Sequence, residues 1–146
     1  MDKKYIDIRE QAFSIKAEDI NLRLENEEQV FASIVDIPVN GNIATLFCSF
    51  DGTVSMYYSN GKIDIGLGKK EAVRKAAMSL LFSSGQCLSY MDSLENHIID
   101  GSVIQIFVFY RDGIKTKKID IMNSKAKEER FLNFLIQNVL TAMRRD

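Results

Sequence analysis

The stretch DGTVSMYYSNGKIDIGLGKKEAVRKAAMSLLF, residues 51–82, carries the pattern that decides the fold. It opens with the turn dipeptide Asp51-Gly52, after which polar and apolar residues alternate as in a β-strand. A connection rich in glycine follows, and an apolar stripe at helical spacing begins near Lys69. The stretch therefore predicts a strand, a tight connection and a helix that packs on a sheet.

The residues before this stretch predict two further strands. Residues 30–39 and 43–50 are rich in β-prone apolar residues, and Asn40-Gly41 between them suits a two-residue hairpin turn. Pro38 cannot donate a hydrogen bond within a sheet and is expected at a strand end. A strand at 53–59 and a short one within 62–67 complete this half of the sheet.

The last third repeats the plan. Strands are expected at 102–110 and 114–122 on either side of Asp112-Gly113, followed by a helix from an N-cap at Ser124 to Met143. We expect the central helix to run from Lys69 to about Asp92 through Gly85, with a break at residues 83–85 as the alternative.

The whole chain predicts a single α+β domain, residues 1–146, with an antiparallel sheet of five or six strands. The order is α-βββ(β)-α-ββ-α, and the helices pack on the sheet; the first helix is expected at residues 3–15 and an irregular connector at 16–29. The predicted strands are apolar on both sides, so helices on both faces or a second subunit should cover them.

Register can be predicted from the two Asp-Gly turns. A two-residue loop at Asp51-Gly52 places Leu46 opposite Tyr57 and gathers a row of hydroxyls on that same face, namely Thr53, Ser55, Tyr57 and Ser59. A two-residue loop at Asp112-Gly113 places Phe107 opposite Lys118 and Phe109 opposite Thr116. The other face of that hairpin is the better core, with Ile104, Ile106, Ile119 and Ile121.

Composition limits the function classes. The 146 residues have a formal net charge of -1, which argues against a general nucleic-acid binder. No signal peptide or membrane-spanning run is evident, so we expect a cytoplasmic protein without membrane association. In that reducing compartment Cys48 and Cys87 should be free, buried thiols.

The strongest candidate for a ligand site is the turn that opens the central helix. Gly66, Gly68, Lys69 and Lys70 could present free N–H groups, the helix dipole and two ammonium groups to an anion such as the phosphate of a nucleotide. The spacing matches neither the P-loop nor the dinucleotide fingerprint. The competing interpretation is a tight strand-to-helix turn with solvated lysines.

Two other features allow a functional or a structural interpretation. The hydroxyl row of Ser55, Tyr57 and Ser59 could line a ligand surface, or it could follow from β-propensity alone. Phe107 and Phe109 could form an exposed interface patch, or they could be core beneath the N-terminal helix.

The sequence shows no catalytic, metal or cofactor motif. The single histidine, His97, falls in a polar connector where we expect a solvent-exposed linker residue, and no Cys/His cluster has zinc spacing. We therefore expect a non-enzyme without metal or cofactor.

The run from Asp51 to Gly61, followed by Gly66-x-Gly68 and EAVRKAA, resembles a family of short bacterial proteins with the pattern D-G-T-x-S-x-Y-x-S-x-G and an alanine-rich helix. The resemblance covers residues 32–90. Lys62 and Asp64 stand where the family pattern is richer in glycine. The family is functionally uncharacterised, so the resemblance implies no activity, ligand or site.

These observations predict a bacterial cytoplasmic protein that acts by non-catalytic contact with a protein partner or with itself as a homo-oligomer. The alternative is a small-ligand or nucleotide-binding domain with an anion at the start of the central helix.

Overall fold

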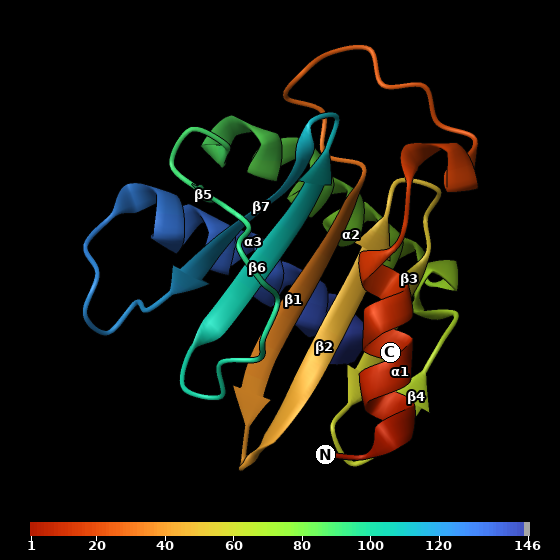
Figure 1. The fold of residues 1–146 in the computed structure, drawn as a ribbon, viewed down its shortest axis with the longest axis vertical. Coiled ribbons are helices and arrows are strands. Elements are labelled where there is room, and N and C mark those ends of the chain that lie inside the picture. The colour runs from red at the N-terminus through yellow and green to blue at the C-terminus, as the bar shows by residue number, and fades with distance from the viewer. Residues whose placement is uncertain (145–146) are drawn as a thin grey trace.

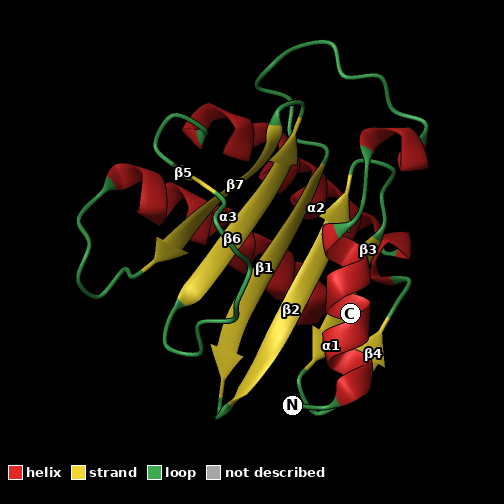
Figure 2. Cartoon of the chain, in the orientation of Figure 1, coloured by secondary structure: helices red, strands yellow, loops and turns green. Residues whose placement is uncertain are grey.

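A computed structural model describes residues 1–144 and has an α+β fold (Figures 1 and 2). The helices are α1 (Lys3–Phe13), α2 (Glu71–Ser84) and α3 (Lys127–Arg144), with 3-10 turns η1 (Ala17–Ile20), η2 (Leu67–Lys69) and η3 (Gly85–Cys87). The strands are β1 (Ala32–Val39), β2 (Asn42–Ser49), β3 (Val54–Tyr58), β4 (Ile63–Asp64), β5 (Asp92–Ser93), β6 (Ile104–Tyr110) and β7 (Gly113–Ile119).

The strands form one antiparallel sheet in the order β4-β3-β2-β1-β6-β7-β5. The predicted fold class is confirmed, but the described part of the sheet has seven strands, not five or six. The unexpected strand is β5, two residues long, which lies at one edge in a segment where the sequence predicts a helix end and a polar connector.

Both faces of the sheet are covered by the chain itself. Helices α2 and α3 pack on one face, over a core that includes Val35, Leu46 and Ile106. The other face is covered by α1, by the connector at residues 14–31 and by residues 94–101, which cross in front of β6 and β1 (Figure 1). We call residues 94–101 the strap. Helix cover on both faces was one of the two predicted arrangements.

The β2–β3 hairpin differs from the predicted register by one residue. Leu46 lies opposite Met56, not opposite Tyr57. The loop holds three residues, 50–52, and ends on Gly52 with a φ of 93°, which is a common alternative to the two-residue loop. Because an offset of one residue exchanges the two faces, the hydroxyl row lies on the α1 face of the sheet, away from Leu46.

The β6–β7 hairpin keeps its predicted faces although its register is shifted by two residues. Phe107 lies opposite Thr116 and Phe109 opposite Ile114, because the turn residues are Arg111-Asp112. An even shift leaves each side chain on its predicted face. Ile104, Ile106 and Ile119 accordingly pack under α2 and α3, whereas Ile121 follows the end of β7 and is exposed.

Helix α2 is shorter than predicted, because it ends at Ser84 and continues only as the 3-10 turn η3. The chain makes a close approach at Gly85, because a Cβ atom there would overlap the carbonyl oxygen of Glu28. Gly85 itself has ordinary right-handed backbone angles, so packing and not conformation requires a glycine. The alternative break at residues 83–85 is the correct one.

Helix α3 begins at Lys127, three residues after the predicted N-cap. Ser124 still accepts a hydrogen bond from the Ala126 N–H (3.2 Å) and donates one to Glu129 (2.8 Å). The carboxylate of Glu129 also accepts a hydrogen bond from the hydroxyl of Tyr90. This contact joins the segment after α2 to the first turn of α3.

The hydrogen bonds around Glu129 change the pKa of both partners. Burial raises the pKa of Glu129, but hydrogen bonds from Tyr90, Ser124 and the Asp120 N–H together lower it below its usual value. The hydrogen bond to Glu129, together with burial, raises the pKa of Tyr90 to about 12. Stability should therefore depend on pH through this pair.

We expect Gly85→Ala to destabilise the protein by roughly 1–3 kcal/mol, because the added methyl group requires the connector at Glu28 or α2 to move. Urea unfolding measures the change. The control is Gly101→Ala, whose Cβ would meet only Ile43 Cδ1 at 4.0 Å and should change stability within about 0.5 kcal/mol. Equal effects of the two substitutions would show that the contact with Glu28 is not a constraint.

We expect Tyr90→Phe to reduce stability most between about pH 5 and pH 10. The folded pKa of Glu129 is lowered, so its contribution is present above the unfolded pKa and is lost as pH falls through the folded one. The folded pKa of Tyr90 is raised, so its contribution is lost as pH rises toward about 12. Urea unfolding across this pH range measures the difference from wild type.

Tyr110→Phe is the control for that series, because the Tyr110 hydroxyl makes no hydrogen bond within residues 1–144. Its difference from wild type should not vary with pH. A loss in Tyr90→Phe that is equal at pH 3 and pH 7 would contradict the assignment.

Candidate functional site

The predicted anion site, at the turn of Gly66, Gly68, Lys69 and Lys70, makes hydrogen bonds and close contacts within the protein. The Lys70 ammonium group donates to the carbonyl oxygen of Ala142 in the last turn of α3 (2.8 Å). Gly68 is buried, and a Cβ there would overlap the carbonyl oxygen of Gly52. Gly66 has a φ of 72°, and the N–H groups of Lys69 and Lys70 donate to carbonyls within the turn. These contacts fit the competing interpretation, a tight turn, and the anion site stays a prediction.

Three members of the hydroxyl row are buried on the α1 face, and the fourth, Thr53, is exposed. Ser59 accepts a hydrogen bond from the Ile43 N–H (2.9 Å), and its carbonyl accepts one from the N–H of Asp2 (2.9 Å). Tyr57 and Ser55 are also buried, and burial raises the pKa of Tyr57. The chain itself therefore occupies the surface on which a ligand would have to lie.

Phe107 and Phe109 are buried at 0% and 2% exposure. Phe13 of α1 packs edge-on against Phe107, with ring centroids 4.9 Å apart. The two phenylalanines are therefore core in the single chain, which is the second of the two predicted alternatives, and they form no exposed patch.

A buried polar cluster joins α1 to the sheet, and sequence reasoning missed it. The guanidinium of Arg9 donates to both carboxylate oxygens of Asp36 on β1, at 3.2 and 2.6 Å. Thr45 donates to Asp36 (2.8 Å) and lies 2.7 Å from the hydroxyl of Tyr5. Asp36 is fully buried and paired with Arg9, so the ion pair holds α1 against the sheet.

His97 is less exposed than predicted, because it fastens the strap to α1. Its ring stacks on Phe13 with centroids 4.1 Å apart, and its Nε2 lies 2.8 Å from the carboxylate of Glu10. The side chain is 32% exposed. Both ring contacts are structural, and no nucleophile is among them.

The two cysteines are free and buried, as predicted. Burial raises the pKa of Cys48 to about 12, and burial together with the charge of Glu128 raises that of Cys87. A protonated thiol is a poor nucleophile, so neither cysteine is activated in this structure.

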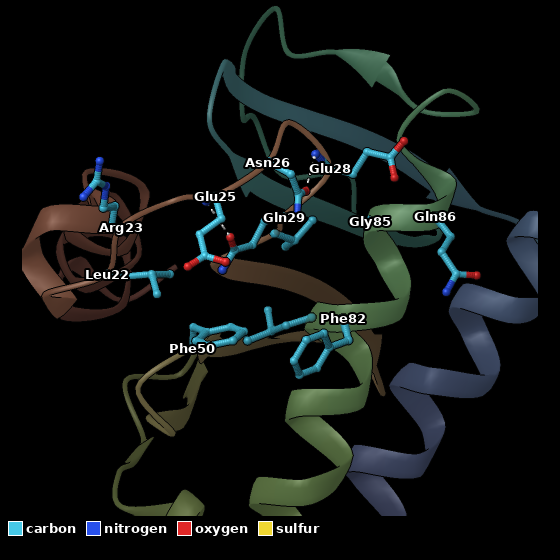
Figure 3. Close-up of a pocket in the computed structure, with 12 residues that line it drawn as sticks. Leu22, Arg23, Glu25, Asn26, Glu28, Gln29, Phe50, Phe82, Gly85 and Gln86 are labelled. Carbon is cyan, nitrogen blue, oxygen red and sulfur yellow. Dashed lines mark hydrogen bonds between the residues drawn. The ribbon is translucent and has the colours of Figure 1, made fainter.

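A hollow with a volume of about 510 Å³ is bounded by exposed aromatic surface. Phe50, after β2, and Phe82, near the end of α2, lie on one side of it with ring centroids 5.5 Å apart (Figure 3). Glu25 and Gln29 of the connector lie on the other side. Phe82 is 66% exposed, although it is a large apolar side chain. We call this the Phe82 hollow.

The connector side of the Phe82 hollow is braced and acidic. The side chain of Gln29 accepts from the Glu25 N–H (3.1 Å), and that of Asn26 accepts from the Glu28 N–H (2.9 Å). Glu25 and Glu28 form no ion pair within residues 1–144, and Arg23 is the only cation that lines the hollow. The hollow therefore combines an apolar wall with a net negative rim.

Within residues 1–144, no group of three or more histidine, cysteine or acidic side chains is placed to hold a metal ion. None of the helices in that range combines the length and the apolar character that crossing a membrane requires.

We expect Arg9→Met to destabilise the protein by roughly 3–5 kcal/mol, because it leaves the Asp36 carboxylate buried without its cation. The double variant Arg9→Met/Asp36→Leu should recover most of that loss, since a buried ion pair can be replaced by apolar side chains. Urea unfolding tests both.

The matched control is Lys75→Met, which breaks an exposed ion pair with Glu71 and should cost less than about 1 kcal/mol. If the double variant were as unstable as Arg9→Met, an uncompensated Asp36 charge would not be the cause.

The comparisons with known proteins give no relative for this fold or site. No protein-family model, no curated protein and no solved structure matches the chain. The resemblance to short bacterial proteins therefore stays a prediction, and function must be argued from the geometry alone.

Proposed function

We propose that this is a non-catalytic binding protein that uses the Phe82 hollow to hold a short segment of another protein, with an apolar side chain flanked by lysine or arginine. The single observation that carries the proposal is the exposure of Phe82, at 66%, beside a hollow with unpaired carboxylates on its rim.

The apolar part of the proposal rests on the aromatic wall. Exposed aromatic side chains that border a hollow are typical anchor points of protein interfaces. Phe50 supports Phe82 from the side of the sheet, so the wall is already formed before a partner binds. A volume of about 510 Å³ lies within the range of ordinary ligand sites.

The basic part of the proposal rests on charge. Glu27 is already paired with Arg111 (3.1 Å), whereas Glu25 and Glu28 have no such partner among the described residues. A lysine or arginine beside the apolar anchor would complement them. The proposal keeps the expected cytoplasmic location, which two free buried thiols support.

The test is selection from a displayed random-peptide library, followed by affinity measurement on the enriched peptides. We expect an aromatic or aliphatic residue next to lysine or arginine. Phe82→Ser should weaken these peptides by more than about tenfold, as truncation of an aromatic anchor does. Glu25→Lys/Glu28→Lys should select acidic peptides instead.

Phe134→Ser is the matched control, because Phe134 is 59% exposed on α3 and does not line the hollow. It should leave peptide affinity unchanged. Equal binding by Phe82→Ser and wild type would overturn the proposal. So would a sedimentation mass that rises with concentration and returns to that of a monomer in Phe82→Ser, because the occupant would then be a second copy of this chain.

A further inference from the structure

A second hollow lies between the strap and the β6–β7 hairpin. Its volume is about 1060 Å³, and its polar lining includes Gln105 of β6, Thr116 of β7 and residues of the strap. It shares no lining residue with the Phe82 hollow, so the inference drawn from it does not depend on the proposed function. We call it the Gln105 hollow.

Gln105 carries an unsatisfied hydrogen-bond acceptor. The residue is 6% exposed, its Nε2 donates to Thr116 Oγ1 (2.9 Å), and its Oε1 is buried without a partner. Thr116 Oγ1 donates its own proton to the carbonyl oxygen of Ile106 (2.9 Å), so it must accept from Gln105. This chain of donors fixes the amide orientation and leaves Oε1 as the free group.

Neither residue paired with Gln105 in the sheet donates to this oxygen. Lys118 lies opposite on β7, and its ammonium group is bound to Asp100 (2.9 Å). Asp36 lies opposite Gln105 on β1, but its carboxylate is an acceptor that already binds Arg9 and Thr45. An acceptor buried without a donor costs roughly 1–3 kcal/mol, and such groups in native proteins call for a bound partner.

The other buried orphan has an alternative explanation. Within residues 1–144, only the Ser33 hydroxyl oxygen and Gln105 Oε1 are buried side-chain atoms without a partner. Ser33 lies opposite Cys48, and its hydroxyl lowers the thiol pKa against the larger rise caused by burial. Ser33 therefore has a thiol opposite it, whereas Gln105 is the orphan that lines a hollow.

The charges around the Gln105 hollow favour a cation. Asp92, Glu95 and Asp100 line it, and Lys118 is the one lining cation. Lys118 is bound to Asp100 (2.9 Å), and this contact, with hydrogen bonds from Ser102, holds the pKa of Asp100 well below its usual range. Asp92 is paired with Lys117 (3.5 Å), so Glu95 is the lining carboxylate without an ion pair within the described chain.

We propose that the Gln105 hollow binds a small organic cation with an ammonium or guanidinium group. One N–H of the ligand donates to Gln105 Oε1, and its charge lies among the carboxylates of Asp92, Glu95 and Asp100. A quaternary ammonium ion lacks the required N–H and fits the same charges without satisfying the orphan acceptor.

The test compares two dications of equal length by calorimetry: 1,4-diaminobutane and its fully N-methylated bis-quaternary analogue. We expect the diamine to bind about tenfold more tightly, as one additional hydrogen bond provides. The side-chain amide resonances of Gln105 should shift with the diamine only. Gln105→Met should remove the preference for the diamine.

Glu95→Gln is the second variant, for the case that Gln105→Met does not fold, because Glu95 is exposed and lines the hollow. It should lower the affinity for both dications by the same factor. Glu18→Gln, an exposed carboxylate outside the hollow, is the control and should change neither affinity. Equal affinity of the two dications, or no binding of the diamine up to about 10 mM, would overturn the proposal. In the second case a buried water molecule would be the partner of Oε1.

Discussion

The buried ion pair between Arg9 and Asp36 is the interaction on which the rest of the structure depends. Asp36 lies in β1, the central strand of the sheet, where an unpaired carboxylate would be very costly. Arg9 neutralises it and thereby places α1 across the sheet. Once α1 is there, Phe13 covers Phe107 and offers the ring on which His97 stacks, so the strap is held down as well. The ion pair at Asp36 thus positions both α1 and the strap on this face of the sheet.

The sequence contained a signal for this pair, which pattern reasoning could have used. Arg9 falls on the apolar stripe of the first predicted helix, four residues after Tyr5, and Asp36 interrupts an otherwise apolar run. Opposite charges at two positions that the periodicity predicts to be buried are expected to pair, because each alone would be too costly. What the sequence does not contain is the path of the strap. That path depends on contacts between distant residues, among them those from Phe13 and Glu10 to His97, that no local pattern specifies.

The two hairpins show which parts of a sheet can be predicted from local sequence. The six predicted strands and the Asn40-Gly41 turn were correct, because they depend on alternation and on residues that accept positive φ, whereas the two-residue strand β5 was not predicted. The register of the β2–β3 and β6–β7 hairpins was not predicted correctly, because Asp-Gly is compatible with loops of different length. At Gly52 the error was one residue and exchanged the faces of β3. At Gly113 it was two residues and left the side chains of β6 and β7 on their predicted faces. Of the glycines in the expected anion site, Gly68 allows a close approach to the carbonyl oxygen of Gly52.

The two hollows differ in the chemical character of their central side chain, which is apolar in one and polar in the other. Neither hollow could be predicted from the sequence. The Phe82 hollow exists because Gly85 lets the connector lie against the end of α2, which leaves Phe82 outside the core beside Phe50. The Phe82 hollow is therefore defined by an apolar side chain that the fold does not cover. The Gln105 hollow concerns a polar group that the fold covers without satisfying. Since the cluster around Asp36 shows that this face can satisfy a buried polar group fully, the open acceptor one strand away is a specific feature of the site and not a general looseness of packing.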